Sequence, residues 1–512
     1  MNALDKIEFE HLATADVIDL LWTTKGTFGR RKAPAHPGLL AWTQDAIGLY
    51  MSARHTDQRE RALAGAPLTT PVNGSWTVRH AWTTPDPRGV TAVEQTAWGR
   101  YYANSTDTHR DLWLLSFGSA KPDRPEAEKA AAASVALHGA VTVRDDISEP
   151  DWRRGYRRTS PRLPPQVQRV RLVDVGCTDG SVRPLADWSA DEVEEEFARH
   201  TKSALDRAIT ATSTQPGASC VNCKALSGCT ALPRTPQLLT IAAAGPAQRR
   251  SVSVSDLRAY ADCPAKFLLT RQLKLKSKQP ENAAIRRGRA VDAWLNRRHQ
   301  TDPASPCRRP ITPAELLAHA TPEAPLHAED AEKAAQMLRQ HVYVCPLVGL
   351  APTEQVRVQD TVSCYIPELN LVVLATPDLL HTRNGGWVWR ETKTSGSGLF
   401  EGKPLLAQYP QLALAILMIN AGALGGDVSR SRVELELLTA DDAVLEELDP
   451  SRTRVVDEAR SVISDLADPW LKEAAYDPLP GRACQSCEAL DWCTPGQQYL
   501  TTNAERGHTD AG

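Results

Sequence analysis

The chain has 512 residues, enough for two or three domains with complete hydrophobic cores. Hydrophobic residues make up 42% of it and charged residues 24%, which is typical of a globular protein in water. The formal net charge of −3 excludes attraction of a nucleic acid by the charge of the whole chain, so such a partner would need a local basic surface.

The sequence predicts neither an export signal nor a membrane span. The N-terminus, MNALDKIEFEHLATADV, lacks a basic segment followed by an apolar run. The most apolar run, Leu412–Leu424, is too short to cross a bilayer. We therefore expect a cytoplasmic protein without a membrane partner. In such a reducing compartment the 11 cysteines argue against a disulfide framework, and six of them, in two arrays of identical spacing, indicate metal binding.

The first half is expected to contain a strand, a helix, a second strand and a second helix. Apolar strand-like runs lie at 111–121 and 167–175, with an alanine-rich helical stretch at 127–140 between them. A charged helical pattern follows at 189–209, and then three cysteines with the spacing Cys-x2-Cys-x5-Cys. These are Cys220, Cys223 and Cys229.

The second half repeats this order. Strand-like runs at 386–396 and 431–439 alternate with helical patterns at 405–424 and 451–467, and the same cysteine spacing follows. The three cysteines are Cys484, Cys487 and Cys493. The repeated order indicates an internal duplication, for which the cysteine array carries most of the evidence. Two unrelated domains with similar C-terminal segments are the alternative.

Composition suggests the domain boundaries. We expect a first domain at 1–235, a linker at 236–250 in a segment rich in Pro, Ala and Gly, and a second domain at 251–497. A helical insert is expected near 299–345, and residues 498–512 are expected to form a disordered polar tail.

The second domain begins with SVSVSDLRAYADCPAKFLL, in which Ser253 or Ser255 can cap a helix that carries one cysteine, Cys263. Farther along, an apolar strand is expected to end at Asp378, RNGG to form a hairpin turn, and WVWRETK to return as a second strand. Because side chains of a strand alternate between faces, Glu391 and Lys393 point the same way, and the hairpin can bring Asp378 beside them.

Two carboxylates and a lysine at strand ends can form a site for a hard divalent cation and a positioned water. Such a water can become the nucleophile on a phosphodiester, and the lysine can orient it or stabilise the charge that grows on the phosphate. A solvated hairpin with a salt bridge is the alternative interpretation of these residues.

These residues resemble the PD-(D/E)XK nuclease superfamily. The pattern D-x12-E-x-K follows an apolar strand, and SDLRAYADCPAKFLL is similar to the start of the RecB-like branch. GRAVDAWL and PQLALAILMI fall where that branch has its Gly-x-x-x-His and Gln-x-x-x-Tyr motifs. One upstream cysteine with three downstream is similar to the iron–sulfur subset of the branch, which includes AddB-type helicase–nuclease subunits and CRISPR-adaptation exonucleases. The resemblance covers residues 251–497.

The resemblance implies an α/β fold with a restriction-endonuclease-like core, a mixed sheet flanked by helices, duplicated with a degenerate N-terminal copy. It also implies that Asp378 and Glu391 bind Mg²⁺ or Mn²⁺ and that Lys393 is the catalytic lysine.

The chain departs from the family at two positions. Asp292 stands where the family has histidine, and a carboxylate there can still ligate the metal. Gln411 keeps the glutamine of the last motif, but Ala415 replaces its tyrosine, which puts the grip on DNA in doubt. The alternatives are an ordinary helix-surface residue for Asp292 and a capping or core-edge amide for Gln411.

The cysteines of the second half suit a 4Fe–4S cluster, because three are local and the fourth lies far upstream. The proposed ligands are Cys263, Cys484, Cys487 and Cys493. Zinc and unliganded thiols are the alternatives. For the first array, Cys177 is the only nearby candidate for a fourth ligand, so that array can hold an incomplete second cluster, a zinc ion or nothing.

In the first half, other residue types stand at the positions expected for the catalytic residues. An alignment that places Asp378 on Ala103 also places Glu391 on Ser116 and Lys393 on Gly118. We therefore interpret the first half as a degenerate nuclease fold kept for structure or for DNA handling.

Two groups of basic residues can neutralise DNA phosphates, and the aromatic side chains among them can stack on bases. Charge runs on a solvated face are the alternative. The first group is Lys266, Arg271, Lys274, Lys276, Lys278, Arg286, Arg287, Arg289, Arg297 and Arg298. The second is Trp152, Arg153, Arg154, Tyr156, Arg157 and Arg158.

Two functions are compatible with these features. The first is a metal-dependent DNA nuclease, favoured as an exonuclease on single strands or duplex ends, in repair, recombination or defence against foreign DNA. The second is a catalytically impaired DNA-binding or scaffold subunit of a nuclease–helicase complex. The chain has no G-x-x-x-x-G-K-[ST] motif, so processive degradation of duplex DNA would need a separate helicase.

Overall fold

The computed structural model divides the chain into two compact units. Unit 1 comprises Met1–Ser213, Leu269–Lys278 and Pro480–Gly512, and unit 2 comprises Thr214–Leu268 and Gln279–Leu479. Among the helices that the structure describes, none has the length and apolar character needed to cross a membrane. The described residues are 2–23, 35–83, 90–121, 123–144, 156–158, 166–210, 214–242, 248–278, 281–301, 307–309, 311–320 and 325–509.

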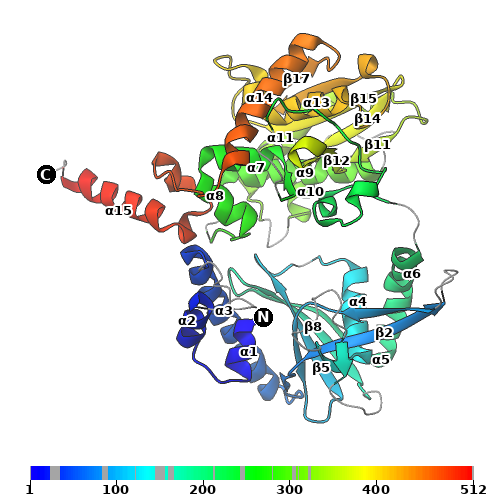
Figure 1. Ribbon diagram of the computed structural model, residues 1–512, viewed down its shortest axis with the longest axis vertical. Helices are drawn as coiled ribbons and strands as arrows, with labels where there is room; N and C mark the ends of the chain where they lie inside the picture. Colours follow the sequence, from blue (N-terminus) through cyan, green and yellow to red (C-terminus); the bar gives the residue numbers. More distant parts are fainter. Residues whose placement is uncertain are drawn as a thin grey trace. The chain divides into compact units, whose positions relative to one another are not determined.

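Unit 1 contains a five-stranded mixed sheet in the order β1-β4-β5-β8-β9. Its strands β5 and β8 are labelled in Figure 1. Its central strands, β5 (His109–Ser116) and β8 (Arg169–Gly176), are parallel, and the other neighbours are antiparallel. A second sheet has the order β3-β2-β6-β7. The other strands are β1 (Thr70–Pro71), β2 (Ser75–Thr83), β3 (Val90–Thr96), β4 (Arg100–Ala103), β6 (Ala140–Arg144), β7 (Tyr156–Arg158) and β9 (Val182–Ser189).

Helices cover both faces of the five-stranded sheet of unit 1. α3 (Pro37–Leu63) packs on the face that carries Trp113, and α4 (Glu126–His138) packs on the face that carries Leu112. Because successive side chains of β5 alternate, each face has its own hydrophobic core. The other helical elements are α1 (Asn2–Glu8), α2 (Thr14–Thr23), α5 (Ala190–Glu196), a π-helical turn (Phe197–Thr201), α6 (Lys202–Thr210) and α15 (Thr494–Thr509).

Unit 2 contains a five-stranded sheet in the order β11-β14-β15-β16-β17. Here too the central strands, β15 (Gly386–Thr394) and β16 (Arg432–Leu438), are parallel, and the other neighbours are antiparallel. A three-stranded sheet has the order β10-β13-β12. The other strands are β10 (Arg250–Val252), β11 (Val356–Val358), β12 (Val362–Ile366), β13 (Leu371–Ala375), β14 (Leu379–Arg383) and β17 (Ala443–Leu448).

Helices also cover both faces of the main sheet of unit 2. α13 (Pro410–Asn420) packs on the face of Trp389 and Leu435, and α11 (Ala328–Val344) shares a core with Leu438 on the opposite face. The other helices are α7 (Val254–Asp262), α8 (Pro264–Phe267), α9 (Ala283–Thr301), α10 (Pro313–Ala318), α12 (Leu405–Gln408) and α14 (Thr453–Lys472).

The α/β class and the mixed sheets flanked by helices are therefore confirmed. The predicted order of strand, helix, strand and helix is present in both units. Helices connect the two parallel central strands of unit 2, whereas in unit 1 the connection contains α4 followed by β6 and β7. The strand order and directions of the two main sheets are the same. The predicted cap of α7 is also present, because the Ser253 hydroxyl and the Asp256 carboxylate form a capping box.

Three expectations differ from the structure. The apolar run expected to end at Asp378 is two strands in different sheets, β13 and β14, because Pro377 cannot donate to a sheet ladder and interrupts it. The segment expected to be a disordered tail is helical through Thr509. It belongs to α15 (Thr494–Thr509), which starts directly after Cys493 and has Pro495 in its first turn. The cysteine arrays lie in exchanged units: Cys220–Cys229 in unit 2 and Cys484–Cys493 in unit 1.

Candidate active site

A tight hairpin places the predicted acidic and basic residues. Asn384 and Gly385 connect β14 to β15 with φ of 54° and 83°, as a two-residue type I′ turn requires. The resulting register pairs Leu379 with Arg390. One residue farther from the turn, Asp378 therefore lies opposite Glu391.

Asp378, Glu391 and Lys393 form one polar cluster. Lys393 Nζ lies 3.0 Å from Glu391 Oε2 and 3.2 Å from Asp378 Oδ2. The Glu391 residue is only 5% exposed, whereas the Lys393 side chain is 34% exposed. A buried carboxylate does not fit a solvated surface hairpin, and the partly exposed lysine leaves the cluster accessible from solvent.

Neighbouring groups hold the two carboxylates in place. The backbone N–H of Thr392 donates to Asp378 Oδ2 at 2.8 Å, and Gln359 Nε2 donates to Asp378 Oδ1 at 3.0 Å. Trp389 Nε1 donates to Glu391 Oε1 at 3.1 Å. Sequence reasoning missed Gln359 because it lies in the loop between β11 and β12, where no motif marks it.

The cluster combines two carboxyl groups with one lysine, and burial and these charges shift the pKa values of Glu391 and Lys393. Burial raises the pKa of Glu391, and the charge of Asp378 adds to this shift while Lys393 opposes it. Burial alone would lower the pKa of Lys393, but Glu391 and Asp378 raise it above its usual range, so the lysine is protonated. Carboxylates held together in this way against their own repulsion are typical of cation-binding and catalytic sites.

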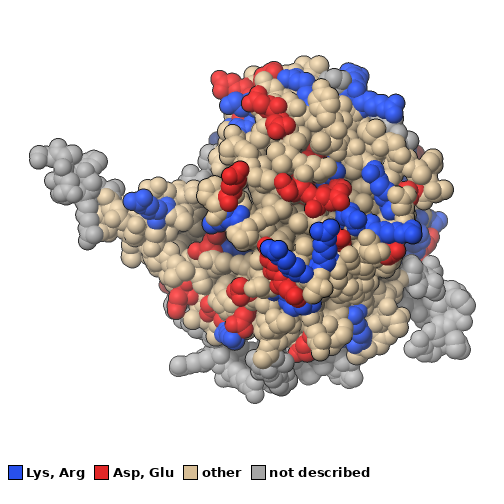
Figure 2. Space-filling model, turned by 90° about the horizontal axis from the view of Figure 1, so that it is seen from above, with Lys and Arg blue, Asp and Glu red and all other residues tan. Residues whose placement is uncertain are grey.

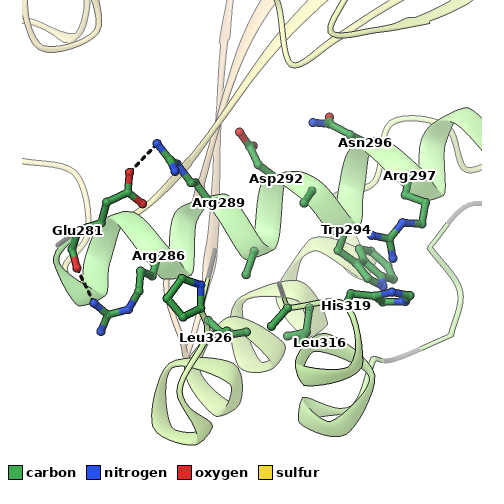
Figure 3. A pocket seen from close by; sticks show the side chains of 14 residues that line it. Glu281, Arg286, Arg289, Asp292, Trp294, Asn296, Arg297, Leu316, His319 and Leu326 are labelled. Atoms are coloured by element: carbon green, nitrogen blue, oxygen red, sulfur yellow. Dashed lines mark hydrogen bonds and ion pairs between the residues drawn. The ribbon is translucent and has the colours of Figure 1, made fainter. Parts of the chain in front are cut away.

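Asp292 belongs to the same electrostatic environment. Burial raises the pKa of Asp292 to about 7, with further upward shifts from Asp378 and Glu391 and an opposing one from Lys393. In Figure 3, Asp292 projects from α9 on the side away from Trp294, which lies beside Leu316 of α10. Asp292 also lines a cavity of about 360 Å³. The geometry agrees, because a Cβ on Gly288 of α9 would lie 3.1 Å from Thr394 Oγ1, so Asp292, one turn later, lies on the helix that packs against the strand of Glu391 and Lys393.

Gln411 lies in the first turn of α13 and is half-buried. Ala415, one turn later on the same helix, is completely buried in the core of unit 2. The helix has bulky apolar side chains on nearly every side, from Leu412 to Ile419. The position of the family tyrosine is therefore filled by core packing, and only Gln411 of that motif remains near the protein surface.

The two cysteine arrays have the same local structure. Each begins with a 3-10 turn, Ala218–Asn222 or Arg482–Ser486, followed by a second short 3-10 turn. The N–H of Gly217 donates to Cys220 Sγ at 3.4 Å, and that of Gly481 donates to Cys484 Sγ at the same distance. Backbone N–H groups directed at sulfur are a feature of metal-thiolate sites.

The second array forms a small cradle of sulfur atoms. A Cβ atom on Gly496 would lie 3.4 Å from Cys493 Sγ and 3.5 Å from Cys484 Sγ, so both sulfur atoms lie beside Gly496. The N–H of Ala489 donates to Cys487 Sγ at 3.4 Å. The donor set and the backbone N–H groups fit a thiolate-bound cluster.

The remote cysteines differ from each other. Cys263 lies between α7 and α8 in unit 2, and its Sγ accepts from the N–H of Leu479 at 3.4 Å. Cys177 is buried in a core of unit 1, and burial raises the pKa of its thiol to about 11. Because a metal ligand must be a thiolate, this burial disfavours Cys177 as the fourth ligand of the first array.

Many of the predicted DNA-binding residues have acidic partners. Arg286 and Arg287 pair with Asp330, and Arg289 pairs with Glu281. Lys266 pairs with Asp262 and Lys278 with Asp45. On the face shown in Figure 2, basic side chains lie in small groups among acidic ones. The second predicted group, with Trp152 and the nearby arginines, lies outside the residues or side chains that the structure describes.

The structure corrects the alignment of the two halves. Ala103 pairs with Arg110 beside the turn, and so it is not equivalent to Asp378, which lies at the open end of its hairpin. The reason is the turn length, since the β4–β5 connection is longer than the two-residue turn between β14 and β15. At the open end of the β4–β5 pair, Gly99 directly precedes β4, and Leu114 and Ser116 project from the same face of β5.

The open end of the β4–β5 pair in unit 1 has a different polar network from the cluster in unit 2. A Cβ on Gly99 would lie 2.6 Å from the carbonyl oxygen of Trp113, which leaves no room for a carboxylate side chain. Ser116 Oγ donates to the buried Asp174 at 2.9 Å, and Arg124 Nε donates to the same carboxylate at 2.7 Å. Asp174 is thus neutralised by an arginine and is not available as a metal ligand.

Comparisons with known proteins support the nuclease resemblance. Residues 251–494 match the family model of the PD-(D/E)XK nuclease superfamily. No curated protein gives a match to the chain. Two solved structures are similar to part of this chain at low sequence identity. The crystal structure of SSO0001 has 16% identity, a TM-score of 0.26, and coverage of 49% of this chain and 89% of its own. A "Putative exonuclease" from Eubacterium rectale has 12% identity, a TM-score of 0.29, and coverage of 46% and 86%.

The matched residues include Asp292, the hairpin with Asp378 and Glu391, and α13, and the sheet that carries them is the restriction-endonuclease-like core. Over residues 251–494, just under half of the chain, the sequence is similar to the PD-(D/E)XK nuclease superfamily.

Proposed function

We propose that the chain is a divalent-metal-dependent DNA nuclease, favoured as an exonuclease on single strands or duplex ends. The observation that carries the proposal is the buried cluster of Asp378, Glu391 and Lys393. The charges of these three residues also shift the pKa of Asp292. Asp378, Glu391 and Asp292 would hold Mg²⁺ or Mn²⁺, because carboxylate oxygens are the ligands that suit a hard cation. The bound cation would supply an activated water and neutralise phosphate charge.

The remaining steps belong to the side chains of the chain itself. Lys393 has three N–H donors, and two of them contact Glu391 and Asp378. The third can stabilise a phosphate oxygen as negative charge develops on it. The N–H of Thr392 and the indole of Trp389 hold the carboxylates in position, so little reorganisation is needed during the reaction. Gln411 would contact the substrate from the start of α13.

The test is direct. Protein purified without oxygen is incubated with labelled single-stranded and duplex DNA and with Mg²⁺, Mn²⁺ or a chelator. The proposal predicts cleavage with either metal and none with the chelator. The replacement of the family tyrosine by Ala415 favours the second candidate function, a catalytically impaired DNA-binding or scaffold subunit, for which no cleavage is expected under any of these conditions.

The biological setting that we propose is repair, recombination or defence against foreign DNA, with a separate helicase for duplex substrates. This proposal rests on the resemblance to the RecB-like branch and on the sequence, in which no nucleotide-binding P-loop was found.

We further propose that a 4Fe–4S cluster is held by Cys263, Cys484, Cys487 and Cys493. Protein purified without oxygen should then be brown and contain about four iron atoms per chain. Cys263→Ser should reduce the iron content and the melting temperature, since the cluster connects distant parts of the chain. Optical absorption and metal analysis measure both, with Cys364→Ser as a control at a buried cysteine outside the arrays. Colourless parent protein with zinc at these thiols would contradict the assignment.

We propose that unit 1 is a degenerate copy of the nuclease fold that handles DNA. Its support is the common strand order of the two sheets and an aromatic pocket at the position equivalent to the active site. Trp98 and Phe117 are 55% and 52% exposed and stack at 5.9 Å between ring centroids. They line a cavity of about 560 Å³ together with Lys121 and Lys276. Exposed aromatic rings beside lysines suit an unpaired base and its phosphate.

Replacing Trp98 by alanine should therefore weaken binding of single-stranded DNA. Loss of one stacked base typically costs about 1–3 kcal/mol, or roughly a tenfold to hundredfold rise in Kd. Fluorescence anisotropy with a labelled oligonucleotide measures the effect, and Leu63→Ala, at a residue 84% exposed in the same unit, is a control. Equal affinities of the three proteins would argue that unit 1 has a structural role only.

A further inference from the structure

A second group of metal-ligand side chains lies on the other face of the main sheet in unit 2. One ligand atom from each of four residues lies within 4.8 Å of the other three. All four residues are buried, with exposures of 0% to 7%. The residues are His299, Cys307, His341 and Cys345. Their donors are two imidazole nitrogens and two thiols, unlike the oxygen donors of the candidate active site.

Three segments supply these side chains. His299 lies in the last turn of α9, and His341 lies in the last turn of α11. Cys345 follows directly after α11, one helical turn beyond His341, so both project toward the same place. Cys307 lies in the connection between α9 and α10. A ligand held by all four would therefore join the ends of two helices to the segment between them.

His341 is oriented as a metal ligand usually is. Its Nδ1 lies 2.5 Å from Glu436 Oε1 on β16, whereas its Nε2 is buried and has no hydrogen-bond partner within the described part of the chain. With the proton on Nδ1, the lone pair of Nε2 is free to bind a cation. A carboxylate that accepts from the second nitrogen of a ligating histidine is a recurrent feature of metal sites.

Glu436 is itself fixed. Thr392 Oγ1 donates to Glu436 Oε2 at 3.1 Å, and Arg390 lies 3.4 Å from the same oxygen. The imidazole of His341 is therefore held from a rigid central strand, and its orientation does not depend on a surface loop.

The two thiols converge on the other histidine. His299 Nε2 lies 3.4 Å from Cys307 Sγ and 3.8 Å from Cys345 Sγ. The backbone on both sides of Cys345 is anchored to the sheet. Arg390 donates to the carbonyl oxygen of Val344 at 2.7 Å, and Arg383 donates to that of Pro346 at 2.6 Å. These two arginines fix the position at which Cys345 presents its sulfur.

We propose that His299, Cys307, His341 and Cys345 bind one Zn²⁺ ion in a closed structural site. Two imidazole nitrogens and two thiolates form the tetrahedral donor set that zinc prefers, and four protein ligands leave no position for a substrate. On binding, both thiols release their protons to solvent, and the two thiolates balance the charge of the ion. The site goes beyond the proposed nuclease function and does not depend on it.

Zinc at this place would also position the candidate active site. Asp292 precedes His299 by two helical turns on α9, so the two side chains project from similar sides of the helix. Fixing the C-terminal end of α9 limits its sliding and rotation over β15. Zinc would thus act as a positioning element for Asp292, without contact with the substrate.

Metal analysis of the full-length protein tests the proposal. After purification without oxygen, the parent protein should contain about one more zinc per chain than either Cys307→Ser or Cys345→Ser. Cys364→Ser is the matched control, because Cys364 is also completely buried but lies outside the group, and it should keep the zinc of the parent. Zinc loss in the two variants should be accompanied by a lower melting temperature.

A second variant keeps all four ligands in case these two do not fold. Glu436→Gln removes the charge that orients His341 and should weaken zinc binding by about 10- to 100-fold in competition with a chromogenic chelator. Cobalt(II) in the zinc-free parent should give the visible spectrum of a tetrahedral thiolate site, and this spectrum should be absent from Cys307→Ser. Equal zinc contents and equal chelator curves in the parent and the three variants of the group would overturn the proposal, as would a disulfide between Cys307 and Cys345 in the anaerobic protein.

Discussion

Glu391→Gln should slow DNA cleavage by at least about 100-fold, while the protein still folds and binds DNA. Glutamine has nearly the same shape, and it can still accept the hydrogen bond from Trp389. It lacks the charge that would bind the divalent cation and that faces Lys393 Nζ at 3.0 Å. DNA affinity should persist because phosphate contacts come mainly from basic side chains elsewhere.

The measurement is the initial rate of release of labelled nucleotides at saturating Mg²⁺ or Mn²⁺, together with a binding assay in a chelator. Glu447→Gln is the matched control, since Glu447 pairs with Arg432 on the same sheet with a side chain that is 56% exposed. It should retain the parent rate. Equal rates for Glu391→Gln and the parent would show that the assigned site is wrong, and an inactive parent with intact DNA binding would support the scaffold function.

Arg390→Met should lower the free energy of unfolding by about 3–5 kcal/mol. The Arg390 side chain is almost completely buried and lies 2.6 Å from Glu434 Oε2. Methionine would fill much of the volume but would leave two buried carboxylates, Glu434 and Glu436, without this counter-charge. It would also remove the donor to the carbonyl oxygen of Val344.

Urea denaturation of the parent and the variant measures this difference. Arg309→Met is the control, because Arg309 pairs with Glu315 at the surface with a side chain that is 78% exposed. Exposed pairs contribute at most about 1 kcal/mol, so this variant should unfold close to the parent. A similar small effect for both variants would mean that water reaches Glu434 and Glu436 when Arg390 is removed.

The sequence was sufficient for the parts of the site that depend on local patterns. The hairpin turn at Asn384 and Gly385 has a strong turn signature, and strand alternation then places Glu391 and Lys393 on one side. The helix cap at Ser253 likewise depends only on residues that are close together in the sequence. Asp292 was predicted as a metal ligand only from its place in a family motif, and it stays a prediction, supported by the packing of α9 on β15.

Other features depend on contacts that no local pattern encodes. His299, Cys307, His341 and Cys345 come from segments up to 46 residues apart in the sequence, and only the pair His-x3-Cys on α11 gives a visible signal. Likewise, the alignment of the two halves failed because the β4–β5 turn is longer, which a constant shift cannot accommodate. The interruption between β13 and β14 at Pro377, in contrast, could have been predicted from the sequence, since proline rarely occurs inside a central strand.

The placement of Pro480–Gly512 in unit 1 has a consequence for synthesis of the chain. Ala489 and Trp492 of this segment are buried in the core of unit 1, together with Trp42 and Leu275. During translation, this core of unit 1 can therefore close only after Ala489 and Trp492 have left the ribosome. Unit 2 has nearly all of its residues earlier, so it can fold first, although proteins usually complete their N-terminal domain first. The N-terminal helices are then the part of the nascent chain that most needs protection by chaperones.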